Sequence, residues 1–282
     1  MDFLEILKAI LFGIVEGITE WLPVSSTGHM ILFDQFVKLN VSDKFYEMFQ
    51  VVIQFGAILA VVVLFWNKLW PFMMKEKKSG SGKTVGWKEG ALDMWLKIIV
   101  ACIPAAVVGL LFDDKIDELF YHPVPVAIAL IVVGVLFIVV ETLRGNREAA
   151  VNSVAELTYK SVIIIGLFQL IAAIFPGTSR SGATIIGALM IGVSRATAAE
   201  FTFFLAVPVM AGASALKIVK YALSGITMSG SELVILLVGT VTAFLVSVLV
   251  IKFFMGYIKK HDFKVFGWYR IVLGILVLLV LR

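Results

Sequence analysis

Six apolar runs, each long enough to cross a bilayer, constrain this chain more than any other feature of its sequence. An α-helix rises about 1.5 Å per residue, so a hydrocarbon core of roughly 30 Å takes about 20 residues, with some allowance for trimmed or tilted ends. A mean hydropathy of +1.01 and a charged share of only 16% agree with a bilayer as the solvent. The sequence therefore predicts an all-α integral membrane protein with six transmembrane helices, at residues 48–66, 95–112, 124–140, 201–216, 233–250 and 266–281.

The N-terminal segment and the single cysteine each exclude one kind of feature. Glu5 and Lys8 interrupt the apolar half of segment 1–17, and no small-residue cleavage site follows, so we expect mature structure and not a removable signal peptide. The single cysteine, Cys102, excludes an internal disulfide or a cysteine-based metal cluster. We expect it to be a small buried side chain.

The distribution of charge predicts the orientation of the chain in the membrane. The connection 68–97 carries seven lysines and 252–264 carries four, whereas 113–122 carries four acids and one lysine. By the positive-inside rule the two lysine-rich connections are cytoplasmic and the acidic one is external. Threading the six spans through these points places both chain termini outside and the linker 141–160 inside.

The two halves of the chain resemble each other at an offset of 153 residues. "GIVEGITEWLPVSSTGH" at 13–29 aligns with "GLFQLIAAIFPGTSRSG" at 166–182, which pairs Gly13 with Gly166, Glu16 with Gln169, Pro23 with Pro176 and, further on, Glu47 with Glu200. Each half is a polar segment followed by three spans, and an odd number of spans inverts the second copy. We therefore predict one transmembrane domain over 1–282 with inverted repeat halves at about 1–141 and 155–282. The alternative is chance similarity between two amphiphilic segments that both contain proline.

Both polar segments are predicted to be re-entrant helical hairpins. Pro23 and Pro176 each remove a backbone donor and end the helix that precedes them. Irregular backbone at membrane depth is tolerated only where protein buries it or where it lines a wet cavity. We expect the two hairpins to enter from opposite faces and to meet inside.

The first hairpin carries two carboxylates one helical turn apart. Glu16 and Glu20 are at i and i+4, so both lie on one face of the helix before Pro23. Ionisable groups inside a membrane segment are costly, so the pair indicates a compensating cation, either a metal ion or a basic side chain. Oxygen ligands without cysteine suit Mg²⁺ or Ca²⁺. Protonated carboxyl groups that cap or bridge helices are the alternative.

Small hydroxyl residues and glycines dominate both turns and favour anion binding. Such a backbone can turn tightly and aim N–H groups at phosphate oxygens. Arg180 adds a permanent charge whose planar fork fits phosphate bidentately. The candidate substrate-binding residues are Ser25, Thr27, Gly28, Gly177, Thr178, Ser179, Ser181 and Thr184.

Ser26 and His29 are within one turn of each other, so a hydroxyl activated by an imidazole is one interpretation. His29 could instead attack phosphorus directly, or simply pack and cap. Paired carboxylates, a cation and a nucleophile beside a base are the groups that phosphoryl transfer requires. The candidate catalytic residues are Glu16, Glu20, Ser26, His29 and Arg180, with Glu16 and Glu20 as metal ligands.

These motifs, together with "AVP" at 206–208, resemble the undecaprenyl-diphosphate phosphatase family, also called the bacitracin-resistance proteins, over essentially the whole chain. The resemblance implies hydrolysis of undecaprenyl diphosphate to undecaprenyl phosphate and inorganic phosphate, which recycles the lipid carrier for peptidoglycan synthesis and confers bacitracin resistance. Carried over by position, the family's functional residues are Glu16, Glu20, Ser25, Ser26, Thr27, His29, Ser179, Arg180, Ser181 and Thr184.

The resemblance also implies where the enzyme works and with what. We expect a multi-pass protein of the bacterial cytoplasmic membrane, with its active site toward the external side. Its partners are a polyprenyl diphosphate substrate and membrane lipids, with no nucleic acid, and a homodimer is left open. The native metal and the choice between Ser26 and His29 as nucleophile are open as well.

Two other functions compete with this reading. Inverted repeats with broken helices are typical of secondary transporters and lipid flippases, although these need no nucleophile beside a base. The acid-phosphatase-like lipid phosphatases need a further histidine shortly after the arginine, and none follows Arg180 until His261. The sequence therefore favours the diphosphate phosphatase.

Overall fold

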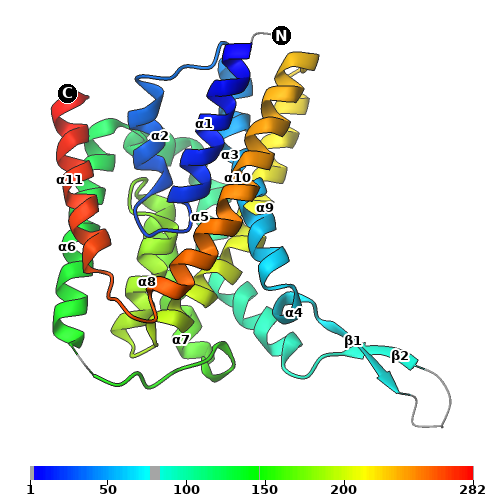
Figure 1. Ribbon diagram of the computed structural model, residues 1–282, viewed down its shortest axis with the longest axis vertical. Coiled ribbons are helices and arrows are strands. Elements are labelled where there is room, and N and C mark those ends of the chain that lie inside the picture. The colour runs from blue at the N-terminus through cyan, green and yellow to red at the C-terminus, as the bar shows by residue number, and fades with distance from the viewer. Residues whose placement is uncertain (1–2, 77–82, 146, 282) are drawn as a thin grey trace.

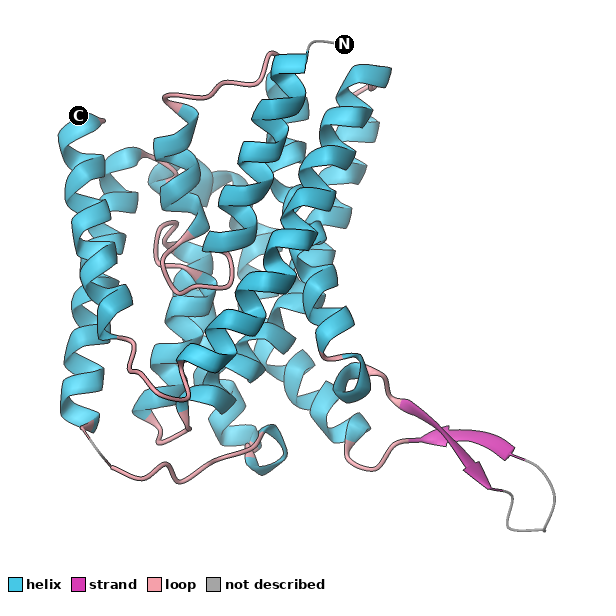
Figure 2. Ribbon diagram, in the orientation of Figure 1, coloured by secondary structure: helices cyan, strands magenta, loops and turns pink. Residues whose placement is uncertain are grey.

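The computed structural model describes residues 3–76, 83–145 and 147–281, and the described chain is a helical bundle (Figure 1). Strands occur in one place among these residues, an antiparallel hairpin in the first lysine-rich connection that the sequence did not predict (Figure 2). The elements are α1 (Phe3–Thr19), α2 (Ser26–Asp34), α3 (Asp43–Leu64), α4 (Trp66–Leu69), β1 (Phe72–Glu76), β2 (Lys83–Trp87), α5 (Ala91–Phe120), α6 (Pro123–Arg144), a 3₁₀ turn (Val154–Glu156), α7 (Tyr159–Ile174), α8 (Arg180–Met190), α9 (Arg195–Leu223), α10 (Gly230–Tyr257) and α11 (Lys264–Val280).

Five of the described helices are long and apolar enough to cross a membrane, which agrees with an all-α membrane protein. They are Asp43–Leu64, Ala91–Phe112, Pro123–Arg144, Arg195–Leu223 and Gly230–Tyr257. The sixth predicted span falls on α11, which has only 17 residues. A helix of that length reaches about 25 Å at 1.5 Å per residue, slightly less than the hydrocarbon core. The count of six spans therefore stays a prediction.

The two polar segments form helix pairs that enter the bundle from opposite ends. In Figure 1, α1 and α2 occupy the end at which both termini lie, and α7 and α8 occupy the other end, near the β hairpin. α1 ends at Thr19, before Pro23, and α7 ends at Ile174, before Pro176. After each of these helices the backbone turns back and forms a short helix, α2 or α8. This is the geometry that the proline positions predict.

The turns of the two hairpins use the same backbone device. Ser25 (φ 74°) and Ser179 (φ 68°) are the non-glycine residues with positive φ in the described chain. Each is an N-cap whose hydroxyl accepts from a glycine N–H, Gly28 at 3.3 Å and Gly182 at 3.2 Å. The second turn has one residue more between its proline and its cap. The two capping serines are therefore 154 residues apart, one more than the two prolines, so the ungapped alignment is wrong by one residue within this turn.

Helix packing follows the same twofold relation. α1 packs against α10 as α7 packs against α5, while α3 meets α9 and α6 meets α11 across the middle. Gly13 and Gly166 permit the first two contacts, since a Cβ at either would meet a neighbouring backbone oxygen at 2.6 Å and 2.5 Å. Cys102 is buried in the large core cluster, as expected.

Candidate functional site

The turns of the two hairpins meet at one carboxylate. Glu20, at the end of the first hairpin's descending arm, is buried, and its Oε1 lies 3.0 Å from Nη2 of Arg180 at the start of α8. Its Oε2 accepts a hydrogen bond of 2.9 Å from the hydroxyl of Ser26 at the start of α2. The structure therefore joins three predicted catalytic residues that come from segments 160 residues apart.

Arg180 is held from its other side by the long central helix α9. Its Nη1 donates to the carbonyl of Thr202 at 2.9 Å, and the hydroxyl of Thr184 lies 2.8 Å from that of Thr202. Thr184 also donates to the carbonyl of Arg180 at 2.9 Å. These contacts fix the guanidinium in a single direction, so its fork is preorganised before any anion arrives.

Glu16 is the unsatisfied member of the site. It is fully buried one turn before Glu20, and neither of its carboxylate oxygens has a hydrogen-bond partner within the described part of the chain. An orphaned carboxylate beside a second carboxylate fits a hard cation, which would supply the missing partner. No group of three or more His, Cys, Asp or Glu able to hold a metal occurs among the described residues. A cation there would need further oxygen ligands besides these carboxylates, such as those of the substrate or of water.

His29 is oriented by two contacts, neither of which involves Ser26. Nδ1 lies 2.7 Å from the carbonyl of Ser25, and Nε2 lies 2.7 Å from the hydroxyl of Tyr269, whose ring stacks on the imidazole. A carbonyl cannot donate, so Nδ1 carries the proton, and in the neutral ring Nε2 accepts from Tyr269. An imidazole as the partner of the Ser26 hydroxyl was one interpretation of the sequence, whereas in the structure that hydroxyl donates to Glu20.

The other predicted binding residues line the same two turns. Ser25 and Ser179 are the helix caps, and the hydroxyls of Ser179 and Ser181 lie 3.1 Å apart. Gly28 packs on α6, where a Cβ would meet Leu130 at 2.9 Å. Thr27, in the first turn of α2, is half-buried. Gly177 and Thr178 lie in the second turn, and their carbonyls accept hydrogen bonds from a side chain that the sequence analysis did not single out.

That contact is made by Arg270, a fully buried residue of α11. Its Nη1 donates to the carbonyl of Pro23 at 3.2 Å, and its Nη2 donates to those of Gly177 and Thr178 at 2.8 and 2.9 Å. One guanidinium thus ties the first turn to the second. The available signal was an arginine inside an apolar run, since intramembrane charges are usually functional. Its neighbour Tyr269, the partner of His29, offered no comparable signal.

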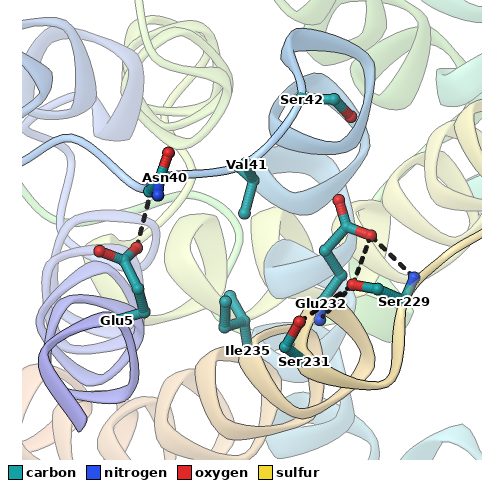
Figure 3. Close-up of a pocket in the computed structure, with 8 residues that line it drawn as sticks. All are labelled: Glu5, Asn40, Val41, Ser42, Ser229, Ser231, Glu232 and Ile235. Atoms are coloured by element: carbon teal, nitrogen blue, oxygen red, sulfur yellow. Dashed lines mark hydrogen bonds between the residues drawn. The ribbon is translucent and has the colours of Figure 1, made fainter. Parts of the chain in front are cut away.

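Two hollows are described on the surface, and only the smaller one adjoins this site. A polar hollow of about 450 Å³ lies at the ends of α1, α3 and α10 (Figure 3). The carboxylates of this hollow stabilise the local structure. Glu5 accepts hydrogen bonds from Lys8 and from the backbone N–H of Asn40, and Glu232 completes a capping box with Ser229. A smaller apolar hollow of about 200 Å³ adjoins the site, lined by Val15, His29, Leu32, Phe33 and Phe36.

Comparison with known proteins gives one consistent result. Residues 9–276 match the family described as "Bacitracin resistance protein BacA". The undecaprenyl-diphosphatase of Desulfitobacterium hafniense is 61% identical over 279 residues, 99% of this chain and 97% of that protein. An undecaprenyl-diphosphatase of Enterococcus faecalis is 59% identical over 280 residues, covering 99% and 98%. One from Streptococcus pyogenes is 50% identical over 279 residues, covering 99% and 97%.

Proposed function

The chain belongs to the bacitracin resistance protein family, and on that basis we propose that it is an undecaprenyl-diphosphatase. It removes the terminal phosphate of undecaprenyl diphosphate, a membrane lipid, and leaves undecaprenyl phosphate and inorganic phosphate. The same reaction accounts for bacitracin resistance and for recycling of the lipid carrier in cell-wall synthesis. A flippase or transporter function, the alternative, is not favoured by these relatives.

The observation that carries this proposal is the position of Glu20 between a hydroxyl and a guanidinium. A carboxylate 2.9 Å from Ser26 Oγ can take the proton of that hydroxyl as it attacks phosphorus. The same carboxylate lies 3.0 Å from Arg180, whose second edge faces Thr202. A transport protein has no need for a hydroxyl held on a base beside an anion clamp.

The reaction follows from these contacts in two displacements. Ser26 Oγ attacks the terminal phosphorus and passes its proton to Glu20, and the bond from phosphorus to the bridging oxygen breaks as undecaprenyl phosphate leaves. Water then attacks the serine-bound phosphorus and the bond from phosphorus to Ser26 Oγ breaks. Glu20 returns its proton to Oγ, and inorganic phosphate leaves with the two protons of the water. Arg180 and the N-terminal N–H groups of α2 and α8 stabilise the charge on the equatorial oxygens.

His29 is the second candidate nucleophile, and its contacts make it the weaker one. Attack through Nε2 requires loss of the 2.7 Å hydrogen bond from Tyr269, and attack through Nδ1 requires loss of the bond to Ser25. We propose instead that His29 holds the carbonyl of Ser25 and so fixes the turn that carries Ser26. On this view the Tyr269 contact keeps the imidazole in one tautomer.

Glu16 and Glu20 would hold a divalent cation, Mg²⁺ or Ca²⁺, in this proposal. The unpartnered oxygens of Glu16 support that assignment. A bound cation would neutralise charge on the diphosphate and so favour the departure of undecaprenyl phosphate. Because only two carboxylates are available, the remaining ligands would be substrate oxygens and water, which is common for Mg²⁺.

The site lies where a membrane lipid can reach it. The apolar hollow beside His29 suits the first isoprene units of the tail, while the diphosphate reaches the meeting point of the turns. The positive-inside rule puts the α1–α2 end of the bundle outside the cytoplasmic membrane, and with it both termini. Tags at the two ends should then react only with external reagents, and Lys88 only with cytoplasmic ones. Cytoplasmic termini would contradict this orientation and leave the reaction itself untouched.

The decisive experiment measures phosphate release from undecaprenyl diphosphate by the purified protein in detergent, with and without Ser26→Ala. We expect release by the wild type and a loss of at least about a hundredfold in the variant. A pure flippase would release no phosphate. Full activity of Ser26→Ala together with an inactive His29→Ala would transfer the nucleophile to His29.

A further inference from the structure

Glu141, near the end of α6, is a buried carboxylate that takes no part in the reaction proposed above. Its side chain is fully buried, and both of its oxygens accept hydrogen bonds. Oε1 accepts from Nε of Arg195 at 2.8 Å and from the backbone N–H of Phe263 at 3.1 Å, and Oε2 accepts from Nη2 of Arg195 at 2.5 Å. One carboxylate therefore joins three segments, namely α6, the start of α9 and the residue that precedes α11.

The two helices that Glu141 joins to α6 also hold the site. α9 begins at Arg195, and Thr202, seven residues later, accepts a hydrogen bond from the catalytic guanidinium through its carbonyl. Phe263 precedes α11, and Arg270, again seven residues later, donates to carbonyls of both turns. Seven residues are close to two turns of an α-helix and span about 10 Å. Each holding group therefore lies two turns along its helix from the contact with Glu141, on about the same face.

α6 and α11 are packed backbone to backbone, so a shift at one end of the pair is carried to the other. A Cβ at Gly134 would meet the carbonyl oxygen of Gly267 at 2.7 Å, and a Cβ at Gly267 would meet that of Gly134 at the same distance. Further along, a Cβ at Gly274 would meet the carbonyl oxygen of Ala127 at 2.8 Å. Such close packing leaves little free volume to absorb a displacement. The contact made by Glu141 therefore sets the position of α11 relative to the two turns.

Neighbouring turns of α6 add contacts to the same two helices, α8 and α9, that flank the catalytic guanidinium. Arg144, about one turn after Glu141, donates through Nη1 to the carbonyl of Val193, just before α9, at 2.7 Å. Phe137, one turn before Glu141, packs on α8, where a Cβ at Gly182 would meet its ring at 3.5 Å. Glu141 thus lies at the centre of the surface through which α6 supports this side of the site.

We propose that Glu141 is a positioning residue for the phosphatase reaction, an inference that rests on the function proposed above. By joining the starts of α9 and α11, Glu141 fixes the Thr202 carbonyl relative to the Arg270 guanidinium. Those two groups hold Arg180 and the turn before Ser26, so the separation of the catalytic side chains follows from the same contact. A buried ion pair adds little net stability, because both charges lose their water. The geometry that it fixes is therefore the better reason for this pair.

The test shortens the carboxylate without removing its charge. Glu141→Asp is one methylene too short to reach Arg195 and the Phe263 N–H together, so α9 and α11 lose their common contact. We expect kcat for phosphate release to fall about tenfold with KM within about twofold of wild type, because lost preorganisation weakens binding of the transition state and not of the lipid. The matched control is Glu200→Asp, since Glu200 of α9 pairs with Lys68 of α4 at 2.7 Å. Its kcat should stay within about twofold of wild type.

Arg195→Lys tests the same contact from its accessible side. The Arg195 side chain is 29% exposed, so the change leaves no charge in the core, and lysine keeps the charge but cannot bind the carboxylate through two edges. We expect kcat to fall at least about threefold, again with KM little changed. This variant keeps the proposal testable if Glu141→Asp does not fold.

Hydrogen–deuterium exchange gives a readout that does not depend on the reaction. The amides of residues 176–182, in the second turn and the start of α8, should exchange at least about threefold faster in Glu141→Asp than in wild type or Glu200→Asp. If the wild type released no phosphate, the proposed function would fall, while exchange would still test the positioning role. Unchanged exchange in Glu141→Asp, wild-type kcat in Arg195→Lys, or an equal loss of kcat in Glu200→Asp would overturn the proposal.

Discussion

The α1–α2 and α7–α8 hairpins share a backbone and divide the chemistry between them. Both end a helix before a proline, turn through a serine with positive φ, and cap a short helix with that serine. Both bury a polar side chain at the same position, Glu16 in one and Gln169 in the other, and neither side chain has a partner among the described residues. The first hairpin supplies acids and an imidazole, and the second supplies the guanidinium.

This division shows why neither hairpin suffices alone. A carboxylate such as Glu20 inside a membrane needs a cation, and Arg180 of the opposite hairpin provides it at 3.0 Å. Arg270 then holds both turns through backbone carbonyls, which leaves the side chains free to diverge. The two turns share one backbone conformation, and their charges are complementary where they meet.

The largest effect is expected from Glu20→Gln, which removes the carboxylate that contacts Ser26 of its own hairpin and Arg180 of the other. As general base for Ser26, Glu20 should account for a loss of about a thousandfold in kcat. An amide still accepts from Arg180, so the fold should survive. Phosphate release measures the loss, and Glu47→Gln, on an exposed part of α3, is the matched control.

Titration of Mg²⁺ and Ca²⁺ against the same variant separates its two proposed roles. A pure metal ligand would give a higher metal concentration at half-maximal rate and recovery at saturation. A base would give a low rate at every metal concentration. An unshifted metal dependence in both Glu20→Gln and Glu16→Gln would remove the metal from this site.

The next effect tests the cation of the second hairpin. Arg180→Lys keeps the charge but cannot bind Glu20 and the Thr202 carbonyl through two edges at once. We expect a loss of about 2 kcal/mol in transition-state stabilisation, roughly thirtyfold in kcat/KM. Arg147→Lys in the exposed linker serves as the control. Activity within a few-fold of wild type would mean that Arg180 compensates Glu20 without touching the substrate.

Much of this arrangement follows from local sequence, and the remainder depends on contacts between distant segments. The apolar runs and the positions of Pro23 and Pro176 predicted the helices and the turns, because a helix and a proline break are local. The ungapped alignment is wrong by one residue in the turn after Pro176, since a turn can lengthen without changing the pattern of the helices around it. The Ser26–Glu20 pair and the role of Arg270 join segments that only the folded bundle brings together.

A smaller effect is expected from exchanging the two unpartnered residues. Glu16→Gln gives the first hairpin the amide of the second, and should lower activity about tenfold at limiting metal while raising thermal stability, because a buried unpaired charge is costly. Gln169→Glu places such a charge in the second hairpin. It should lower the midpoint of thermal unfolding and leave the metal dependence unchanged. A shifted metal dependence in Gln169→Glu would place both side chains around one cation.

The smallest effect concerns the turns themselves, at Ser25 and Ser179. Glycine at either position loses the hydroxyl cap, which costs only a few tenths of a kcal/mol, and it adopts positive φ without strain. Alanine loses the cap and keeps the strain, at a cost of about 1 kcal/mol. The midpoint of thermal unfolding should therefore be about the same for the glycine variants as for wild type, and lower for the alanine variants, at both positions.

Phosphate release then distinguishes the roles of the two serines. If a serine hydroxyl also binds phosphate, its removal raises KM, whatever residue replaces it. Equal KM values for Ser25→Gly, Ser179→Gly and wild type would make both serines caps only, and a rise at one position alone would show which hairpin holds the departing phosphate.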